Sequence, residues 1–226
     1  MEIPERLVFL DVETTGLKPK DDRIIEIFMF SIDADGKVDE YETLINPERK
    51  LPSKIVELTG LTDDQLVNAP KESEIAGDVR EFIGLGTPVA HNLPFDRGFL
   101  NAMFLRNNLL DLGMVGIDTL SLSRQVFPKL CIYPHGGGSH RLGNLMYHFG
   151  LQDAYANSHR AKDDVMLLVE VFRHLQEASS ADSKTKYPQA MTHGCPSCGT
   201  VMYLRCRNDE HFLVCRNIKC KTRIDL

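Results

Sequence analysis

The first strand-like segment of the chain combines apolar residues with two acids. Residues 7–12 are apolar except for Asp11, and Glu13 follows two positions later. Because successive side chains of a strand point to opposite faces, Asp11 and Glu13 are expected on one face, with apolar neighbours on the other. Two like charges in a buried strand are costly unless a cation lies between them, so the pair indicates a metal site. The alternative is a strand that leaves the sheet at Asp11 and keeps both acids in water.

The pattern that follows predicts an α/β fold. Two further strands are expected over 23–32 and 37–45, joined by a turn at 33–36 whose Asp-Gly pair favours a tight reversal. These strands would extend the first one into an antiparallel meander. Beyond them, helical periods alternate with short strands: helices over 53–60, from 62 onward and over 71–82, 95–106, 140–149 and 160–176, and strands at 87–90 and 117–118.

Length and composition indicate a globular protein with one large domain. The chain has 226 residues, of which 42% are hydrophobic and 26% are charged. No stretch approaches the ~18 consecutive apolar residues of a membrane span. The first six residues lack the apolar run of a secretory signal. We therefore expect a cytoplasmic protein with no membrane partner.

A change in composition predicts a domain boundary near residue 178. Residues 178–186 contain no large apolar side chain, which is typical of a linker. We expect a first domain over 1–177, a linker over 178–192 and a separate small module over 193–226. The glycine-rich segment 133–138 lacks the sequence context of a phosphate-binding loop and is expected to be a mobile surface loop.

The distribution of charge permits a nucleic-acid substrate without indicating one. The net charge of −6 argues against nonspecific coating of nucleic acid. However, the segment 195–226 contains six basic and only three acidic residues, so the rest of the chain holds the acidic excess. Acids that are occupied by metal cations would no longer repel phosphate.

Further acids follow predicted strand ends or helix starts. Asp96 comes just after the fourth predicted strand, and Asp118 is expected to be an ordinary strand-end residue. His159 precedes the last helix of the first domain, whose first turn contains both Asp163 and Asp164. The residues that share a helical face with Asp164 are Leu168, Val171 and Leu175. We therefore expect Asp164 to be buried and Asp163 to lie at the surface. Taken singly, Asp96 is also typical of a helix N-terminus, and His159 of a cap or surface residue.

In combination, these motifs resemble the DEDDh group of 3′→5′ exonucleases. This group contains DnaQ-like proteins such as the proofreading epsilon subunit of bacterial DNA polymerase III, and also ribonuclease T. The matching motifs, in the order of the family, are Asp11-Val12-Glu13-Thr14-Thr15-Gly16, His91-Asn92-x-x-Phe95-Asp96 and His159-x4-Asp164. The resemblance covers roughly residues 5–177. It implies a ribonuclease-H-like fold with a five-stranded mixed sheet flanked by helices.

The resemblance also implies a metal-dependent active site. Four acids hold two divalent ions in the family, and here they would be Asp11, Glu13, Asp96 and Asp164. Such hard oxygen ligands suit Mg²⁺ or Mn²⁺. Two ions can stabilise both the attacking and the leaving oxygen of a phosphoryl displacement. His159 would be the general base that deprotonates the attacking water, and the product would be a 5′-mononucleotide released from the 3′ end.

Neighbouring residues are candidates for substrate binding. Thr14 and Thr15 resemble the part of the family that cradles the terminal nucleotide, and Leu17 would wedge against its base. His91 and Asn92 complete this set, with His91 supporting the loop that carries it. The implied substrate is a nucleic acid with a 3′ end, expected to be single-stranded.

Two alternative functions stay open at this point. One is an RNA 3′-trimming enzyme similar to ribonuclease T, because the motifs do not distinguish DNA from RNA. The other is a catalytically silent module that binds nucleic-acid ends. The intact set of acids argues against the silent module, since clustered carboxylates would repel phosphate. A polymerase or repair partner and a homodimer are both compatible with the resemblance.

The C-terminal module carries four cysteines at metal-binding spacing. Cys195 and Cys198 form a CxxC pair, and Cys215 and Cys220 form a CxxxxC pair, with 16 residues between the two pairs. Two such pairs resemble a zinc ribbon, similar to those at the C-termini of bacterial type I topoisomerases. Four thiolates of this kind hold one structural Zn²⁺. Disulfides are the alternative, but they are less typical of a cytoplasmic chain.

The rest of this module leaves several alternatives. Cys206 is expected to be a free thiol, with replacement of a neighbouring cysteine ligand as the alternative. His193 and His211 are rival metal ligands of lower rank. Strands over 201–204 and 211–214 would form the hairpin of the ribbon. Its basic and aromatic residues suit single-stranded nucleic acid, but a solvated face or a protein-docking surface is equally compatible with them.

Overall fold

The computed structural model describes residues 5–127, 130, 140–179, 195–198, 202–207, 210–215 and 219–225. The chain divides into two compact units. The first unit comprises Met1–Thr119 and Ala156–Val169, and the second comprises Leu120–Tyr155 and Glu170–Leu226. The candidate residues of the exonuclease site all belong to the first unit, and the four clustered cysteines belong to the second.

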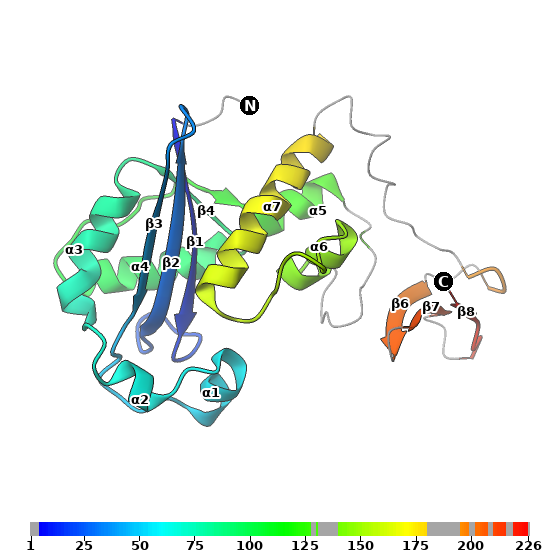
Figure 1. The fold of residues 1–226 in the computed structure, drawn as a ribbon, viewed down its shortest axis with the longest axis horizontal. Coiled ribbons are helices and arrows are strands. Elements are labelled where there is room, and N and C mark those ends of the chain that lie inside the picture. The colour runs from blue at the N-terminus through cyan, green and yellow to red at the C-terminus, as the bar shows by residue number, and fades with distance from the viewer. Residues whose placement is uncertain are drawn as a thin grey trace. The chain divides into compact units, whose positions relative to one another are not determined.

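The first unit is built on a five-stranded mixed sheet (Figure 1). Its strands are β1 (Arg6–Thr14), β2 (Ile24–Asp33), β3 (Val38–Leu44), β4 (Thr87–Ala90) and β5 (Ile117–Asp118), in the order β3-β2-β1-β4-β5. The central strand β1 pairs antiparallel with β2 and parallel with β4. β2 and β3 are antiparallel, whereas β4 and β5 are parallel. The predicted meander and the predicted five-stranded mixed sheet are both confirmed.

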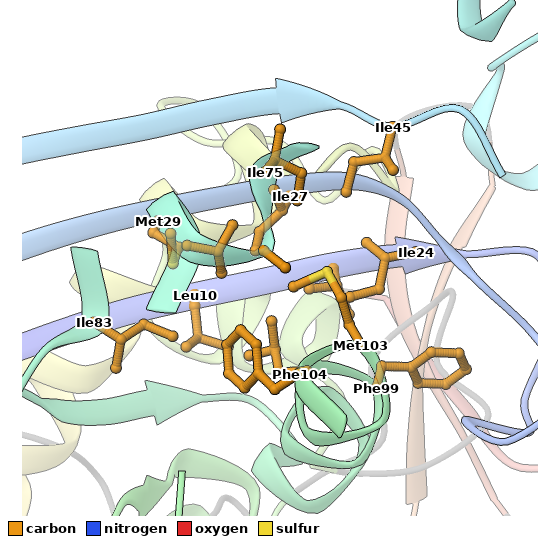
Figure 2. Packing of buried hydrophobic residues seen from close by; sticks show 14 of the residues in the cluster. Leu10, Ile24, Ile27, Met29, Ile45, Ile75, Ile83, Phe99, Met103 and Phe104 are labelled. Atoms are coloured by element: carbon orange, nitrogen blue, oxygen red, sulfur yellow. The ribbon is translucent and has the colours of Figure 1, made fainter. Parts of the chain in front are cut away.

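Two helices pack their apolar sides against the sheet and form the main core. These helices are α3 (Glu72–Ile83) and α4 (Leu93–Arg106). Figure 2 shows Phe99, Met103 and Phe104 of α4 beside apolar side chains of β1 and β2, and all three are fully buried. Burial of one such side chain stabilises the fold by about 1.5–3 kcal/mol. β1 and α4, which both carry candidate site residues, are therefore held by the same core.

A second, smaller apolar cluster forms where two short helices follow the meander. α1 (Ser53–Thr59) and α2 (Asp63–Leu66) come directly after β3 in the chain order. Ile25, Leu61 and Leu66 make up the buried part of this cluster. Because Ile25 belongs to β2, the cluster ties this helical segment to the sheet that carries the site.

The last helix of the first domain is longer than the sequence predicts. α7 runs over Ala161–Ser179, so it continues two residues into the segment 178–192 that was expected to be linker. Residues 180–192 of that segment, the glycine-rich segment 133–138 and His193 lie outside the described residues.

The second unit contains two further short helices and a small sheet. α5 (Thr119–Val126) and α6 (Leu142–His148) lie along the chain before α7, and the sequence pattern did not predict α5. β6 (Met202–Arg207), β7 (Glu210–Cys215) and β8 (Arg223–Asp225) form an antiparallel sheet in that order. The predicted hairpin is thus confirmed with a third strand added. The side chains of Cys206 and His211 lie outside the part of the chain that the structure describes.

No helix among the described residues combines the length and the apolar character that crossing a membrane requires.

Candidate active site

The first acids of the site lie at one edge of the five-stranded sheet. β1 and β4 are parallel, so their carboxyl ends lie on the same edge. In open α/β sheets this edge is the usual place for a ligand site. Asp11 and Glu13 stand near the carboxyl end of β1. The carboxyl end of β4 leads through His91 and Asn92 into α4, whose first turn carries Asp96.

Asp96 is fixed directly against β1. The backbone N–H of Val12, the residue between the two acids of β1, donates a hydrogen bond to Asp96 Oδ1 at 3.2 Å. The Asp96 residue is only 2% exposed, whereas Asp11 and Glu13 are half-buried. A short side chain held in this way has little freedom to turn away from its neighbours. The three carboxylates are therefore set side by side by the fold itself.

The start of α4 is held by an acid that the sequence pattern did not assign to the site. Asp118 Oδ1 accepts hydrogen bonds from the backbone N–H groups of Asn92, at 2.9 Å, and Leu93, at 3.3 Å. Asn92 adopts a left-handed backbone conformation with φ 76°. His91 Nδ1 lies 3.0 Å from Thr119 Oγ1. Asp118 therefore fixes the point from which α4 presents Asp96.

The loop before α7 and the first turn of α7 bring the third motif to the same place. Asp164 is only 6% exposed and Asp163 is exposed, as the helical spacing predicts. Ligand atoms of Glu13, His159 and Asp164 all lie within 4.8 Å of one another. Asn157 Nδ2 donates a hydrogen bond to Asp164 Oδ1 at 2.9 Å and fixes this carboxylate from the loop side.

We call the four carboxylates Asp11, Glu13, Asp96 and Asp164 the acid cluster. Burial, together with the Asp164 and Glu26 charges, raises the pKa of Asp11 from 3.8 to about 8. Burial and the Asp11 carboxylate, with smaller effects of the other nearby acids, raise the pKa of Glu13 to about 9.

The two helical members of the acid cluster are shifted in the same direction. The pKa of Asp96 is raised by burial and by the Asp11 carboxylate. The pKa of Asp164 is raised by burial, and its hydrogen bond from Asn157 opposes the shift. All four carboxylates therefore resist ionisation unless a positive charge joins them.

The donor set of the acid cluster fits a divalent cation. It supplies carboxylate oxygens, which are the ligands that Mg²⁺ and Mn²⁺ prefer. A cation would relieve the repulsion that raises these pKa values, because an opposite charge nearby favours the ionised form. His159 is exposed beside the cluster and is the only imidazole among the described ligand groups there.

Glu26 is a site neighbour that the sequence analysis missed. It lies on β2 directly opposite Glu13 in the β1–β2 register and is 2% exposed. It accepts hydrogen bonds from the Arg160 guanidinium group and from the Ala161 backbone N–H. Its signal was present in the sequence, because Glu26 interrupts an apolar run just as Asp11 does.

The loop after β1 is held in a defined shape by its own polar groups. Thr14 Oγ1 donates to the Gly16 carbonyl at 2.6 Å, and Thr15 Oγ1 donates to Asp22 Oδ1 at 3.3 Å. Asp22 Oδ2 accepts the Lys18 N–H at 2.9 Å. A Cβ added at Gly16 would lie 2.5 Å from Asp22 Oδ2, so this position requires glycine for close approach.

The same loop presents one large apolar side chain to solvent. Leu17 is 81% exposed, although it directly follows residues that are hydrogen-bonded within the loop. The loop stands at the carboxyl end of β1, beside Asp11 and Glu13. An exposed leucine on a fixed loop at this edge is suited to contact a planar base of a bound nucleic acid.

The four cysteines of the second unit form a separate cluster. The Sγ atoms of Cys195, Cys198, Cys215 and Cys220 all lie within 4.8 Å of one another. The Sγ atoms are 3.5 Å apart for Cys195 and Cys220 and 3.4 Å apart for Cys198 and Cys215, and all four residues are free cysteines. These distances are far longer than the ~2.0 Å of a disulfide. They are close to the ~3.8 Å sulfur separation that a tetrahedral site with ~2.3 Å Zn–S bonds would have.

The ionisation of Cys195 also favours a metal ligand. Hydrogen bonding from the Thr222 hydroxyl, supported by backbone N–H groups and Cys220, lowers the pKa of Cys195 from 9.0 to about 6. A lowered pKa makes the thiolate, which is the form that binds metal, available at neutral pH. The cluster therefore has the chemistry of a zinc site.

Comparison of the sequence with known families identifies the first domain. A family model described as Exonuclease (RNase_T) matches residues 8–172. The chain is 41% identical over 162 residues to the DNA polymerase III subunit epsilon of Treponema pallidum (strain Nichols), over 72% of each chain. It is 39% identical over 160 residues to the DNA polymerase III PolC-type of Bacillus subtilis (strain 168), over 70% of this chain and 10% of that relative.

A solved structure supports the same fold. E. coli Exonuclease I in complex with a dT13 oligonucleotide matches with a TM-score of 0.62 at 20% sequence identity, over 81% of this chain and 42% of that chain. At this identity the likeness concerns the fold alone. It confirms the predicted ribonuclease-H-like exonuclease fold.

We predict that the metal-free protein loses stability relative to Asp11→Asn as the pH rises. A carboxyl group whose pKa is raised from 3.8 to about 8 by folding binds more protons in the folded state than in the unfolded state. Its contribution to stability is therefore largest below about pH 4 and declines until the pH reaches about 8. Thermal unfolding in EDTA between about pH 5 and about pH 8 measures this change.

The melting temperature of wild type minus that of Asp11→Asn should fall steadily as the pH rises through this range. A wild-type to Asp11→Asn difference that does not depend on pH would contradict the raised pKa of Asp11.

Proposed function

The chain belongs to the RNase_T exonuclease family, and we propose that it hydrolyses DNA from the 3′ end and releases 5′-mononucleotides. The observation that carries this proposal is the acid cluster. Carboxylates from one strand and two helices converge so that Asp164 raises the pKa of Asp11 and Asp11 raises that of Glu13 and Asp96, beside a histidine that is open to solvent. A module that only binds nucleic acid would gain nothing from such a concentration of negative charge.

The divalent cations, two Mg²⁺ or Mn²⁺ ions, would be held by the acid cluster of Asp11, Glu13, Asp96 and Asp164. Bound there, the cations would supply positive charge to stabilise the attacking and leaving oxygens of an in-line phosphoryl displacement. The protein's own contribution is to fix the four carboxylates before substrate arrives. The hydrogen bonds of Asp96 with Val12 and of Asp164 with Asn157 serve this purpose.

His159 is proposed as the general base that takes a proton from the attacking water. Histidine suits proton transfer at neutral pH. The ring nitrogen of His159 lies within 4.8 Å of carboxylate oxygens of Glu13 and Asp164, and the residue is exposed, so water can reach it. Its position on a loop, just before α7, lets it face the substrate phosphate from outside the acid cluster.

The loop after β1 is proposed to hold the terminal nucleotide. Thr14 and Thr15 are buried and hydrogen-bonded, so they shape the loop, while the exposed Leu17 packs against the base. His91 and Asn92 border the same edge of the sheet at the end of β4. Single-stranded 3′ ends suit this arrangement because an unpaired terminal base is free to stack against Leu17.

The named relatives favour DNA and a polymerase or repair partner. The relative at 41% identity is named as a subunit of DNA polymerase III, and the solved exonuclease structure contains a dT13 oligonucleotide. We propose by analogy that this chain acts on DNA, alone or together with such a partner. The alternative, trimming of RNA, is tested in the same assay.

The direct assay uses 5′-labelled single-stranded DNA, duplex DNA and RNA oligonucleotides with Mg²⁺, Mn²⁺ or EDTA. We predict stepwise shortening of the 5′-labelled single strand with either metal, slower cleavage of RNA, and none with EDTA. Asp164→Asn should lower the rate by at least ~100-fold, since it removes a carboxylate from the acid cluster. Absence of degradation with every substrate and metal would refute the proposal.

Asp163→Asn is the matched control for this assay. Asp163 stands next to Asp164 on the same helix but is exposed, so its change should leave the rate within about twofold. Equal losses in the two variants would show that Asp164 has no special role.

We also propose that residues 193–226 are a zinc ribbon with one structural Zn²⁺ held by Cys195, Cys198, Cys215 and Cys220. The linker that joins the ribbon to the exonuclease domain would start after the end of α7 at Ser179. A sheet of three short strands has too few residues to fold without such a crosslink. The basic residues of the ribbon suit it to hold DNA or a partner protein.

We predict that purified protein contains one zinc atom per chain. Cys198→Ser should reduce the zinc content well below one, whereas Cys131→Ser, far upstream of the four cysteines in the sequence, should leave it unchanged. Metal analysis of the three proteins by mass spectrometry measures this. Zinc absent from the wild type, or retained in full by Cys198→Ser, would contradict the four-cysteine site.

A further inference from the structure

Glu26 is a fifth carboxylate beside the acid cluster. It is 2% exposed on β2, opposite Glu13, and its charge contributes to the raised pKa of both Asp11 and Glu13. Adding a further negative charge to a repulsive cluster is unfavourable. The position of Glu26 therefore calls for an interaction strong enough to compensate.

That interaction joins Glu26 to Arg160 and Ala161 at the start of α7, and we call it the clamp. Arg160 Nε donates to both carboxylate oxygens of Glu26 at 3.0 Å, and Arg160 Nη2 donates to Oε1 at 2.6 Å. The backbone N–H of Ala161, the first residue of α7, donates to Oε2 at 3.1 Å. Such a two-pronged pairing of guanidinium and carboxylate fixes both distance and orientation.

The clamp leaves Glu26 poorly suited to bind a metal ion. Oε1 receives hydrogen bonds from two guanidinium nitrogens, and Oε2 receives one from Nε and one from the Ala161 N–H. Both oxygens are thus engaged within the protein. Glu26 therefore acts on the site through Arg160, whereas the four members of the acid cluster are proposed to bind the cations directly.

The residue next to the clamp has a strained backbone. His159 has φ 56°, in the left-handed region, which is unfavourable for a non-glycine residue. Such a conformation persists when the surrounding contacts fix it. Arg160 and Ala161, which follow directly, are both tied to β2 by Glu26. Asn157, two residues before His159, is tied to Asp164.

We propose that Glu26 is a positioning residue that, by clamping Arg160 and the first turn of α7 to β2, holds His159 and Asp164 against Asp11 and Glu13. This inference rests on the proposed exonuclease function. It predicts that loss of the clamp slows the chemical step and leaves substrate binding intact, because the hydrogen bonds of Glu26 run to Arg160 and Ala161 at the start of α7.

The test compares Glu26→Gln, Arg160→Gln and the double variant in the single-stranded DNA assay. Each single variant should lower kcat by roughly 10–100-fold, with KM within about twofold of wild type. The double variant should be no slower than the slower single one, since both changes break the same contact. Losses that multiply in the double variant, or an effect on KM alone, would overturn the proposal.

Lys162→Gln is the matched control. Lys162 is also in the first turn of α7 and also pairs with acids of the sheet, Glu40 and Glu42 on β3, but these pairs are about half exposed. Its removal should leave kcat unchanged. A loss in Lys162→Gln equal to that in Glu26→Gln would mean that any sheet contact of α7 matters, which would overturn the specific role of Glu26.

Hydrogen exchange followed by mass spectrometry gives a readout that does not need activity. Amides of residues 157–164 should exchange faster in Glu26→Gln than in wild type or Lys162→Gln, while melting temperatures of the three proteins stay within a few degrees. Unchanged exchange in this segment would overturn the proposal. A wild type that degrades no oligonucleotide would refute the exonuclease function alone, and the exchange result would still decide on the clamp.

Discussion

Mutual repulsion among partly buried carboxylates is the constraint on which the rest of this structure depends. Asp11, Glu13, Asp96 and Asp164 are brought together from β1, α4 and α7, and burial and neighbouring charge raise the pKa of each. Such an arrangement opposes folding in the absence of a cation. It persists because the apolar core beneath it, with Phe99 and Phe104 fully buried, contributes far more than the cluster costs.

The fold positions Asp96 and Asp164, the acids carried by α4 and α7, in the same way. α4 and α7 each begin shortly after a residue in the left-handed conformation, Asn92 with φ 76° and His159 with φ 56°. In each case a buried or half-buried acid on the sheet accepts backbone N–H groups at the helix start: Asp118 for α4 and Glu26 for α7. Because each helix starts abruptly after the left-handed residue, the acid in its first turn, Asp96 in α4 or Asp164 in α7, lies against β1. The helices that carry Asp96 and Asp164 are thus held at their first residues by two other acids, Asp118 and Glu26.

Sequence reasoning reached most of the fold and the site because the relevant signals are local. Alternation in β1 placed Asp11 and Glu13 on one face, and helical spacing separated the buried Asp164 from the exposed Asp163. The apolar run around Glu26 could have marked it as a buried acid. The partners of Glu26 and Asp118 could not be predicted, because they depend on which helix start lies beside each strand. α5 and β8 are short elements with weak periodicity, so their formation is decided by tertiary contacts rather than by pattern. These features depend on contacts between residues that are distant in the sequence, which local patterns do not reveal.

The most direct test of the central claim is calorimetric titration of the metal-free protein with Mn²⁺ near pH 7, in buffers of different ionisation enthalpy. With pKa values of about 8 for Asp11 and about 9 for Glu13, these acids hold protons that a bound cation must displace. The account predicts a binding enthalpy that changes with the buffer, corresponding to proton release, and a smaller release from Asp11→Asn. A binding enthalpy that is the same in every buffer would show that the acids are already ionised, and would contradict the account.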